Sequence, residues 1–114
     1  MLKMTAPEDV AASTPLRPLD DQAAQSLVDL FKLFADETRV RILYFLRHSP
    51  ELNVQNICEL LGQTQPAVSH HLAILRASKL IAMRRQGKHN FYHLLPERFD
   101  ELRSYVAMLE PSRS

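Results

Sequence analysis

The most reactive side chains of the sequence stand near its middle, where Ser69, His70 and His71 follow one another. A hydroxyl beside an imidazole is a pairing that nucleophilic catalysis uses. Adjacent residues of a helix, however, point about 100° apart, so these groups would not converge on one reacting atom. The sequence also contains no glycine-rich phosphate loop and no pair of carboxylates at a useful spacing. We therefore do not expect an enzyme.

The same side chains can instead form hydrogen bonds from one face of a helix. Thr64 is a suitable N-cap, and Pro66 fits the first turn that follows it. Val68, Leu72 and Leu75 then form an apolar stripe. The opposite face is small, polar and free of acid, and consists of Pro66, Ser69, His70 and Ala73. Such a face suits the major groove of DNA, although an ordinary amphipathic surface helix has the same pattern.

Charge is distributed unevenly along the chain, whose 114 residues carry a net charge of +1. Residues 60–96 contain five lysines and arginines, no aspartate or glutamate, and four of the five histidines. Residues 1–59 have nine acids and six bases, and residues 97–114 have four acids and three bases. A local positive field of this kind is expected of a protein that binds a polyanion. Because it coincides with the polar helix, we predict double-stranded DNA as the partner.

The start of the chain divides into an arm and a first helix. Residues 1–19 include three prolines and show no hydrophobic period, so we expect a flexible arm. Residues 20–110 are predicted to form one domain that binds DNA and dimerises, and residues 111–114 a tail. A helix should begin at Asp20 or Asp21 and end near Ala35. Its apolar stripe is Leu27, Leu30, Phe31 and Phe34.

Two further helices precede the polar helix. Asp36 is expected to cap a helix from Glu37 to about His48. Its apolar side is predicted to consist of Val40, Leu43, Tyr44 and Leu46. Residues 52–61 predict a short third helix with one apolar face, made of Val54, Ile57, Cys58 and Leu61. Gly62 should end it in the left-handed conformation, and the short link to Thr64 is typical of a helix-turn-helix.

The hydrophobic period changes after the polar helix. Residues 80–85 and 89–94 read as two strands, and Gly87 suits the turn between them. The tip of this hairpin is flanked by Arg84, Arg85, Lys88 and His89. A basic hairpin directly after a DNA-reading helix is the arrangement of a winged helix, and its charge suits contact with phosphate. The alternative is a hairpin whose charges only protect its edges from aggregation.

A last helix should run from Pro96 to about Leu109, and Phe99 begins its apolar stripe. We therefore predict a mainly α fold with a β-hairpin wing, in the order α-α-α-α-β-β-α. The first and last helices have strong apolar faces, which we expect a second subunit to bury; the alternative is that they only complete a monomer core. A twofold dimer would place two reading helices roughly 34 Å apart on a pseudo-palindrome. The predicted dimer contacts are Leu27, Leu30, Phe31, Leu102, Tyr105, Val106 and Leu109.

Three segments in this order resemble the ArsR/SmtB family of winged-helix repressors. They are residues 34–43 (FADETRVRIL), 65–76 (QPAVSHHLAILR) and 84–92 (RRQGKHNFY), and the resemblance covers about residues 25–109. It implies a homodimer joined by the first and last helices. It also implies a transcriptional repressor that leaves its operator when an inducer binds.

This sequence lacks most of the ligands that form the family's known inducer sites. Its thiolate site lies in a cysteine-rich run, whereas residues 52–58 here read LNVQNIC and keep only Cys58. One thiolate cannot form a three-coordinate soft-metal site or a dithiol switch. At about the positions where the family has its zinc ligands on the last helix, this sequence has Pro96, Arg98 and Leu109. His93 and Asp100 could contribute, but two scattered ligands do not form a tetrahedral zinc site. We expect no metal and no cofactor, and the inducer stays unknown.

The DNA contacts are predicted to be Thr64, Gln65, Ser69, His70, Arg84, Arg85, Lys88 and His89. Two alternatives remain open: a winged-helix module that binds protein, and a repressor that responds to zinc or another ligand through a non-standard site. No secretory signal and no apolar run near the roughly 18 residues of a membrane span is present, so we expect a cytoplasmic protein without a membrane partner. Cys58, the single cysteine, is expected to be core filler.

Overall fold

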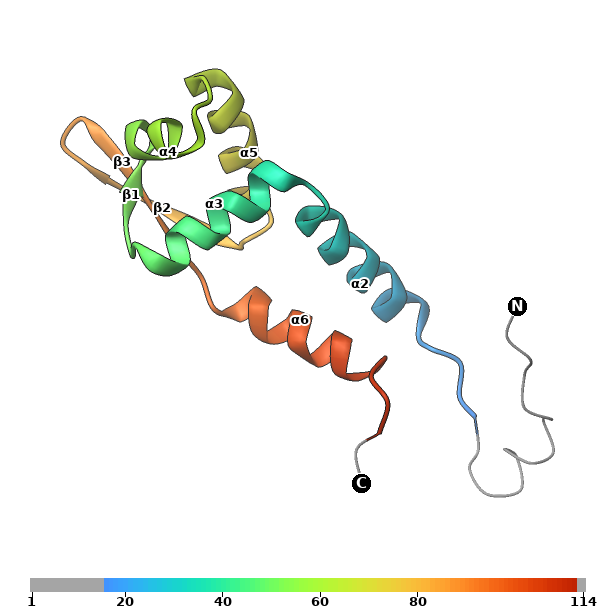
Figure 1. Ribbon diagram of the computed structural model, residues 1–114. Helices are drawn as coiled ribbons and strands as arrows, with labels where there is room; N and C mark the ends of the chain where they lie inside the picture. The colour runs from blue at the N-terminus through green and yellow to red at the C-terminus, as the bar shows by residue number, and fades with distance from the viewer. Residues whose placement is uncertain (1–15, 113–114) are drawn as a thin grey trace.

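The computed structural model describes residues 16–112. Most of the expected arm, residues 1–15, and the last two residues of the expected tail lie outside this part, so both predictions stay untested. Figure 1 shows the fold, which is mainly helical with an antiparallel wing, as predicted. The elements in chain order are α2 (Asp21–Phe34), α3 (Glu37–His48), β1 (Leu52–Asn53), α4 (Val54–Leu61), α5 (Gln65–Ala77), β2 (Ile81–Gln86), β3 (His89–Leu94) and α6 (Glu97–Ala107).

Side-chain caps fix the helix starts where the sequence predicted them. The carboxylate of Asp20 accepts a hydrogen bond from an amide of the first turn of α2, and Asp36 does the same for α3. Thr64 caps α5 through its hydroxyl. Gly62 ends α4 with φ of +65°, a conformation that glycine adopts without strain. The helix bounds are therefore encoded locally.

The segment before α4 differs from the prediction. Leu52 and Asn53 do not belong to the helix but form the short strand β1, which pairs with Tyr92 and Phe91 of β3. The helix starts later because Asn53 and Asn56 exchange hydrogen bonds of 2.8 and 3.1 Å between side chain and backbone. The sheet therefore has three antiparallel strands in the order β1-β3-β2.

The hydrophobic core lies between α3, α4, α5 and the sheet. It consists of Ile42, Leu43, Leu46, Leu52, Ile57, Val68, Leu72, Leu75, Leu80, Ile81 and Tyr92. The predicted apolar side of α3 was partly wrong. Ile42 is fully buried, whereas Val40 and Tyr44 are 43% and 60% exposed, because the core contacts the face of α3 that carries Ile42, Leu43 and Leu46.

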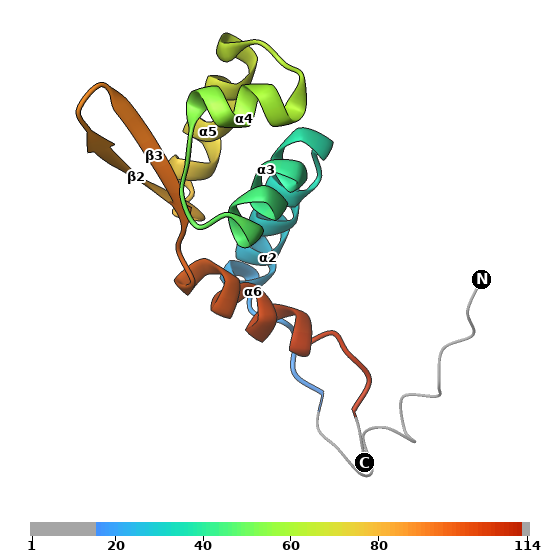
Figure 2. The same cartoon turned by 60° about the vertical axis from the view of Figure 1, so that its left-hand side comes forward.

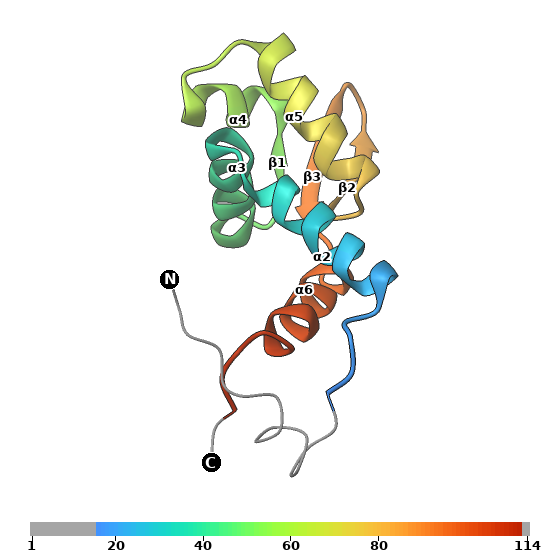
Figure 3. The same ribbon diagram turned by 90° about the vertical axis from the view of Figure 1, so that its right-hand side faces the viewer.

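The helices α2 and α6 lie side by side and extend together away from the winged part, as Figures 1 and 3 show. The rings of Phe34 and Phe99 meet edge to face with their centroids 6.0 Å apart, which ties the two helices to each other next to the core. No residue of α6 is fully buried, and the helix ends at Ala107, slightly before the predicted Leu109. Among residues 16–112, no helix has the length and hydrophobicity needed to cross a membrane.

Candidate DNA-binding surface

The helix α5 places its apolar face against the core and its polar face toward solvent, as predicted. Val68, Leu72 and Leu75 are at most 1% exposed and fix the helix on the core. Ser69 and His70 consequently lie on the exposed face, and Thr64 and Gln65 are exposed at its N-terminal end. The first turn carries no acid, so the positive end of the helix dipole remains available to an anion. Whether these four residues contact DNA stays a prediction.

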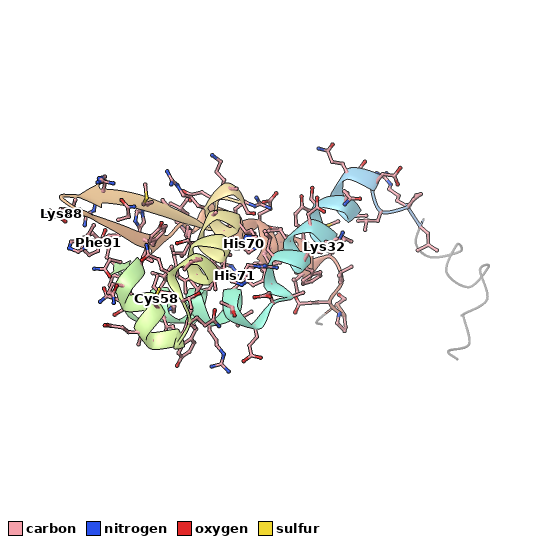
Figure 4. The ribbon with its side chains drawn as sticks, turned by 90° about the horizontal axis from the view of Figure 1, so that it is seen from above. Lys32, Cys58, His70, His71, Lys88 and Phe91 are labelled. Carbon is pink, nitrogen blue, oxygen red and sulfur yellow. The ribbon has the colours of Figure 1, made fainter. Side chains whose placement is uncertain are left out.

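The hairpin β2–β3 carries the second cluster of predicted contacts. Gln86 pairs with His89, so the turn consists of two residues, and its first, Gly87, has φ of +62°. Arg85, Lys88 and His89 are exposed around this turn and form no ion pair within the described residues. Figure 4 shows Lys88 at the far end of the hairpin, with His70 and His71 on α5. The cationic groups thus have no internal competitor for a phosphate.

Arg84 is placed differently from its neighbour Arg85. Its guanidinium bonds both oxygens of the Glu51 carboxylate, at 2.6 and 3.0 Å, and lies 5.5 Å from the ring centre of Phe91. This pairing lowers the pKa of Glu51 and raises the pKa of Arg84. Since Glu51 compensates the charge of Arg84, the structure weakens Arg84 as a phosphate contact. The charge distribution of residues 60–96 does not reveal this ion pair, because Glu51 lies outside that segment.

A polar hollow of about 260 Å³ lies between the turn of the hairpin and the beginnings of α4 and α5. It brings together three predicted contacts, Gln65, Lys88 and His89. Three other polar residues line it that were not among the predicted DNA contacts, namely Asn53, Gln55 and Asn90. No local signal could reveal them, because the hollow forms only when the hairpin folds back beside α4. Two helix N-termini, the ammonium group of Lys88 and the imidazole of His89 at one hollow favour a bound anion.

A polar cluster fixes α5 to the corner between α2 and α3. Arg39 donates hydrogen bonds to the last carbonyls of α2, at Leu33 (2.8 Å) and Lys32 (3.0 Å). Nη1 of Arg39 lies 3.5 Å from Nδ1 of His71. The same Nδ1 of His71 lies 3.6 Å from Oδ2 of Asp36. The backbone N–H of Arg39 lowers the pKa of Asp36, with a smaller contribution in the same direction from the charges of His71 and Arg39 and an opposing one from burial. His71 therefore positions the helix, while His70 beside it faces outward.

The residues predicted to form a dimer interface divide into two groups. Leu27 and Leu30 are only 8% and 0% exposed, so they stabilise the protomer itself. Phe31 and Leu109 are 45% and 58% exposed, and Leu102, Tyr105 and Val106 are half-buried. Val28 of α2 and Met108, which directly follows α6, are also exposed apolar residues, although neither belongs to the predicted dimer contacts.

Cys58 is half-buried and packs against the core, in agreement with its expected role as core filler. Within residues 16–112, no three histidine, cysteine, aspartate or glutamate side chains gather in a way that could hold a metal ion.

Comparison with known proteins gives a consistent result. Residues 36–82 match the family described as bacterial regulatory protein, arsR family. The arsenical resistance operon repressor of Escherichia coli is 48% identical over 69 residues, which cover 60% of this chain and 59% of the repressor. The transcriptional regulator MJ1325 of Methanocaldococcus jannaschii is 35% identical over 78 residues, which cover 68% of this chain and 88% of that protein. The matched part thus spans little more than half of the Escherichia coli repressor.

A solved structure agrees with these relatives. The transcriptional regulator HlyU of Vibrio vulnificus superposes with a TM-score of 0.62 at 33% identity, over 80% of this chain and 94% of HlyU. Together with the exposed polar face of α5 and the cationic wing, the matches show that this chain belongs to the arsR family of bacterial regulatory proteins, which are transcriptional regulators and not enzymes.

Proposed function

We propose that the chain binds double-stranded DNA as a homodimer and represses transcription from a pseudo-palindromic operator. The single observation that supports this most strongly is the convergence of three features on one surface. These are the acid-free outer face of α5, the unpaired cations of the hairpin turn, and the polar hollow between them. The folded unit that performs this function would be residues 20–110, with residues 111–114 as a tail.

The two parts of this surface have different roles in the proposal. Ser69 and His70 read base edges in the major groove, where hydroxyl and imidazole groups can donate and accept hydrogen bonds. Thr64 and Gln65 contact the backbone near the start of α5. Arg85, Lys88 and His89 bind phosphate, and Lys88, His89 and Gln65 direct one phosphate into the hollow. Arg84 contributes less, because Glu51 holds its guanidinium.

The dimer in this proposal forms through the exposed surface of α2 and the end of α6. Phe31 and Leu109 remain available for it, together with Val28 and Met108, whereas Leu27 and Leu30 are already buried. Exposed apolar side chains of this size on adjacent helices favour burial by a partner. A twofold axis there would place the two α5 helices on successive major grooves, roughly 34 Å apart.

The names of several relatives refer to arsenic or cadmium resistance, and those functions belong to the relatives. Because this chain has one cysteine, even a dimer would bring only two thiolates together. We therefore propose a repressor that does not use a three-thiolate soft-metal site.

Unbiased selection of bound duplexes by the purified protein, with and without added zinc, tests this function. We expect an enriched pseudo-palindrome whose half-sites lie about one helical turn apart. A titration of that duplex at low and moderate salt should show a steep loss of affinity with salt, because phosphate contacts release counterions. No enrichment and no binding at low salt would favour a module that binds protein. Enrichment only in the presence of zinc would favour a non-standard zinc sensor.

A further inference from the structure

An apolar groove of about 550 Å³ lies between α3, the end of β3 and α6, and it shares no lining residue with the polar hollow. Its apolar lining includes Leu43, Leu94 and Phe99, together with Val40 and Tyr44. These last two are the residues that the sequence pattern predicted to be core. They are 43% and 60% exposed within the described chain, although a helix that folds onto a core normally covers such side chains.

Two arginines stand at the same groove, Arg47 from α3 and Arg103 from α6. Arg103 is paired with Asp100, whereas Arg47 forms no ion pair within residues 16–112. The phenol of Tyr44 has no hydrogen-bond partner there either, and its ring lies with its centroid 4.4 Å from that of His48. The groove therefore combines an apolar interior with one free guanidinium and one free hydroxyl.

From this combination we propose that the groove binds a small organic anion with an aromatic or branched apolar body. The body would lie against Leu43 and Phe99, and its carboxylate or sulfonate would accept paired hydrogen bonds from the planar guanidinium of Arg47. A volume of about 550 Å³ lies within the range of small-molecule sites, roughly 300–1,000 Å³. Cysteine, aspartate, glutamate and histidine are absent from its lining, so the chemistry favours an organic anion over a metal ion.

A second copy of the chain is a less suitable occupant than a small anion. Figure 2 shows α6 in front of α2, with α3 above it. The groove is lined by residues of α3, the end of β3 and α6, and by none of α2. The exposed Val28 and Phe31 belong to α2 and not to the groove. The groove also carries the free charge of Arg47 and its lining contains no acidic residue, so two copies of the groove placed face to face would leave that charge uncompensated.

A pair of fluorescent probes tests the proposal on the full-length protein. 1-Anilinonaphthalene-8-sulfonate has a fused aromatic body and one negative charge, and N-phenyl-1-naphthylamine has the same body without the charge. We expect saturable binding of the sulfonate at one site per chain and weaker binding of the neutral probe. Arg47→Gln should lower the affinity for the sulfonate about tenfold, the equivalent of one charge-assisted contact, and leave the neutral probe unchanged.

Arg41→Gln is the matched control, because it removes the same charge from an exposed position of α3 outside the groove. It should leave both probes unchanged. Val40→Glu should abolish binding of both, since it places a hydrated carboxylate in the apolar lining that the body of either probe contacts, and circular dichroism would show that the variant is folded. Equal affinity for the two probes, insensitivity to Arg47→Gln, or the absence of saturable binding would overturn the proposal. Dissociation of a wild-type dimer by Val40→Glu, with no probe binding in either protein, would assign the groove to a second copy.

Discussion

The winged part of the molecule and the pair of helices α2 and α6 differ in how far a single chain completes them. In the winged part, three helices and a sheet enclose a continuous core, and the helices that form it have side-chain caps. In the helix pair, α6 has no fully buried residue and no side-chain cap. Large apolar side chains face solvent on α2, at Val28 and Phe31, and directly after the end of α6, at Met108 and Leu109. The proposed reading surface therefore rests on a scaffold that a single chain completes, whereas the helix pair leaves large apolar side chains exposed.

The largest expected effect contrasts the truncation of a buried leucine in the winged part with that of an exposed leucine at the end of the helix pair. Leu72→Ala removes a side chain that is 1% exposed, so it should lower the free energy of unfolding by roughly 2–5 kcal/mol. Leu109→Ala removes one that is 58% exposed and should change it by less than about 0.5 kcal/mol in the monomer. Urea denaturation at a concentration that keeps the protein monomeric measures both. Similar losses for the two variants would contradict the division into a complete part and an open part.

The next effect tests what covers the helix pair. Phe31→Asp places a charge on the exposed surface of α2, so it should dissociate the dimer and weaken operator binding about a hundredfold through loss of bivalency. Leu60→Asp is the control, because Leu60 is similarly exposed but lies on α4 in the winged part. Sedimentation velocity and fluorescence anisotropy give the two readouts. A dimer that survives Phe31→Asp and dissociates with Leu60→Asp would place the interface on the winged part and contradict its assignment to the helix pair.

A smaller effect separates the cations of the wing. Lys88→Ala should reduce the slope of log affinity against log salt by about one, since Lys88 is free to bind phosphate. Arg84→Ala should change the slope much less, because that guanidinium is held by Glu51. Anisotropy titrations at several salt concentrations measure the slopes. Equal changes for the two variants would show that Glu51 releases Arg84 when DNA binds.

The smallest effect concerns the junction between the two parts. The pKa of Asp36 is lowered mainly by the amide of Arg39, so its ionised form stabilises the native state above the usual value of 3.8. This contribution is lost as the pH falls through the lower native pKa. Asp36→Asn keeps a capping oxygen without the charge. The stability difference between wild type and variant should be constant above about pH 5 and shrink at lower pH, as measured by urea unfolding. A difference that does not change with pH would exclude this role.

Local patterns predicted most of the fold. Asp36, Thr64 and Gly62 determine helix ends through bonds to residues within one turn, so the sequence alone reveals them. The exposed face of α5 followed from the spacing of Val68 and Leu72 for the same reason.

The features that the sequence did not reveal depend on distant partners. The strand β1 exists because Leu52 meets Tyr92, and Arg84 is neutralised by Glu51, 33 positions away. The burial of Leu30 and the exposure of Tyr44 depend on how α2 and α3 pack, which a helical period does not specify. The polar hollow likewise joins three separate segments of the chain.

The most direct test of the central claim compares the affinity of the protein for its selected duplex with its affinity for a scrambled duplex of the same composition. If α5 reads bases and the wing binds phosphate, Ser69→Ala combined with His70→Ala should reduce this preference by at least about tenfold while affinity for the scrambled duplex stays nearly unchanged. A double variant that keeps the full preference of the wild type would contradict the assignment of α5 as the reading helix.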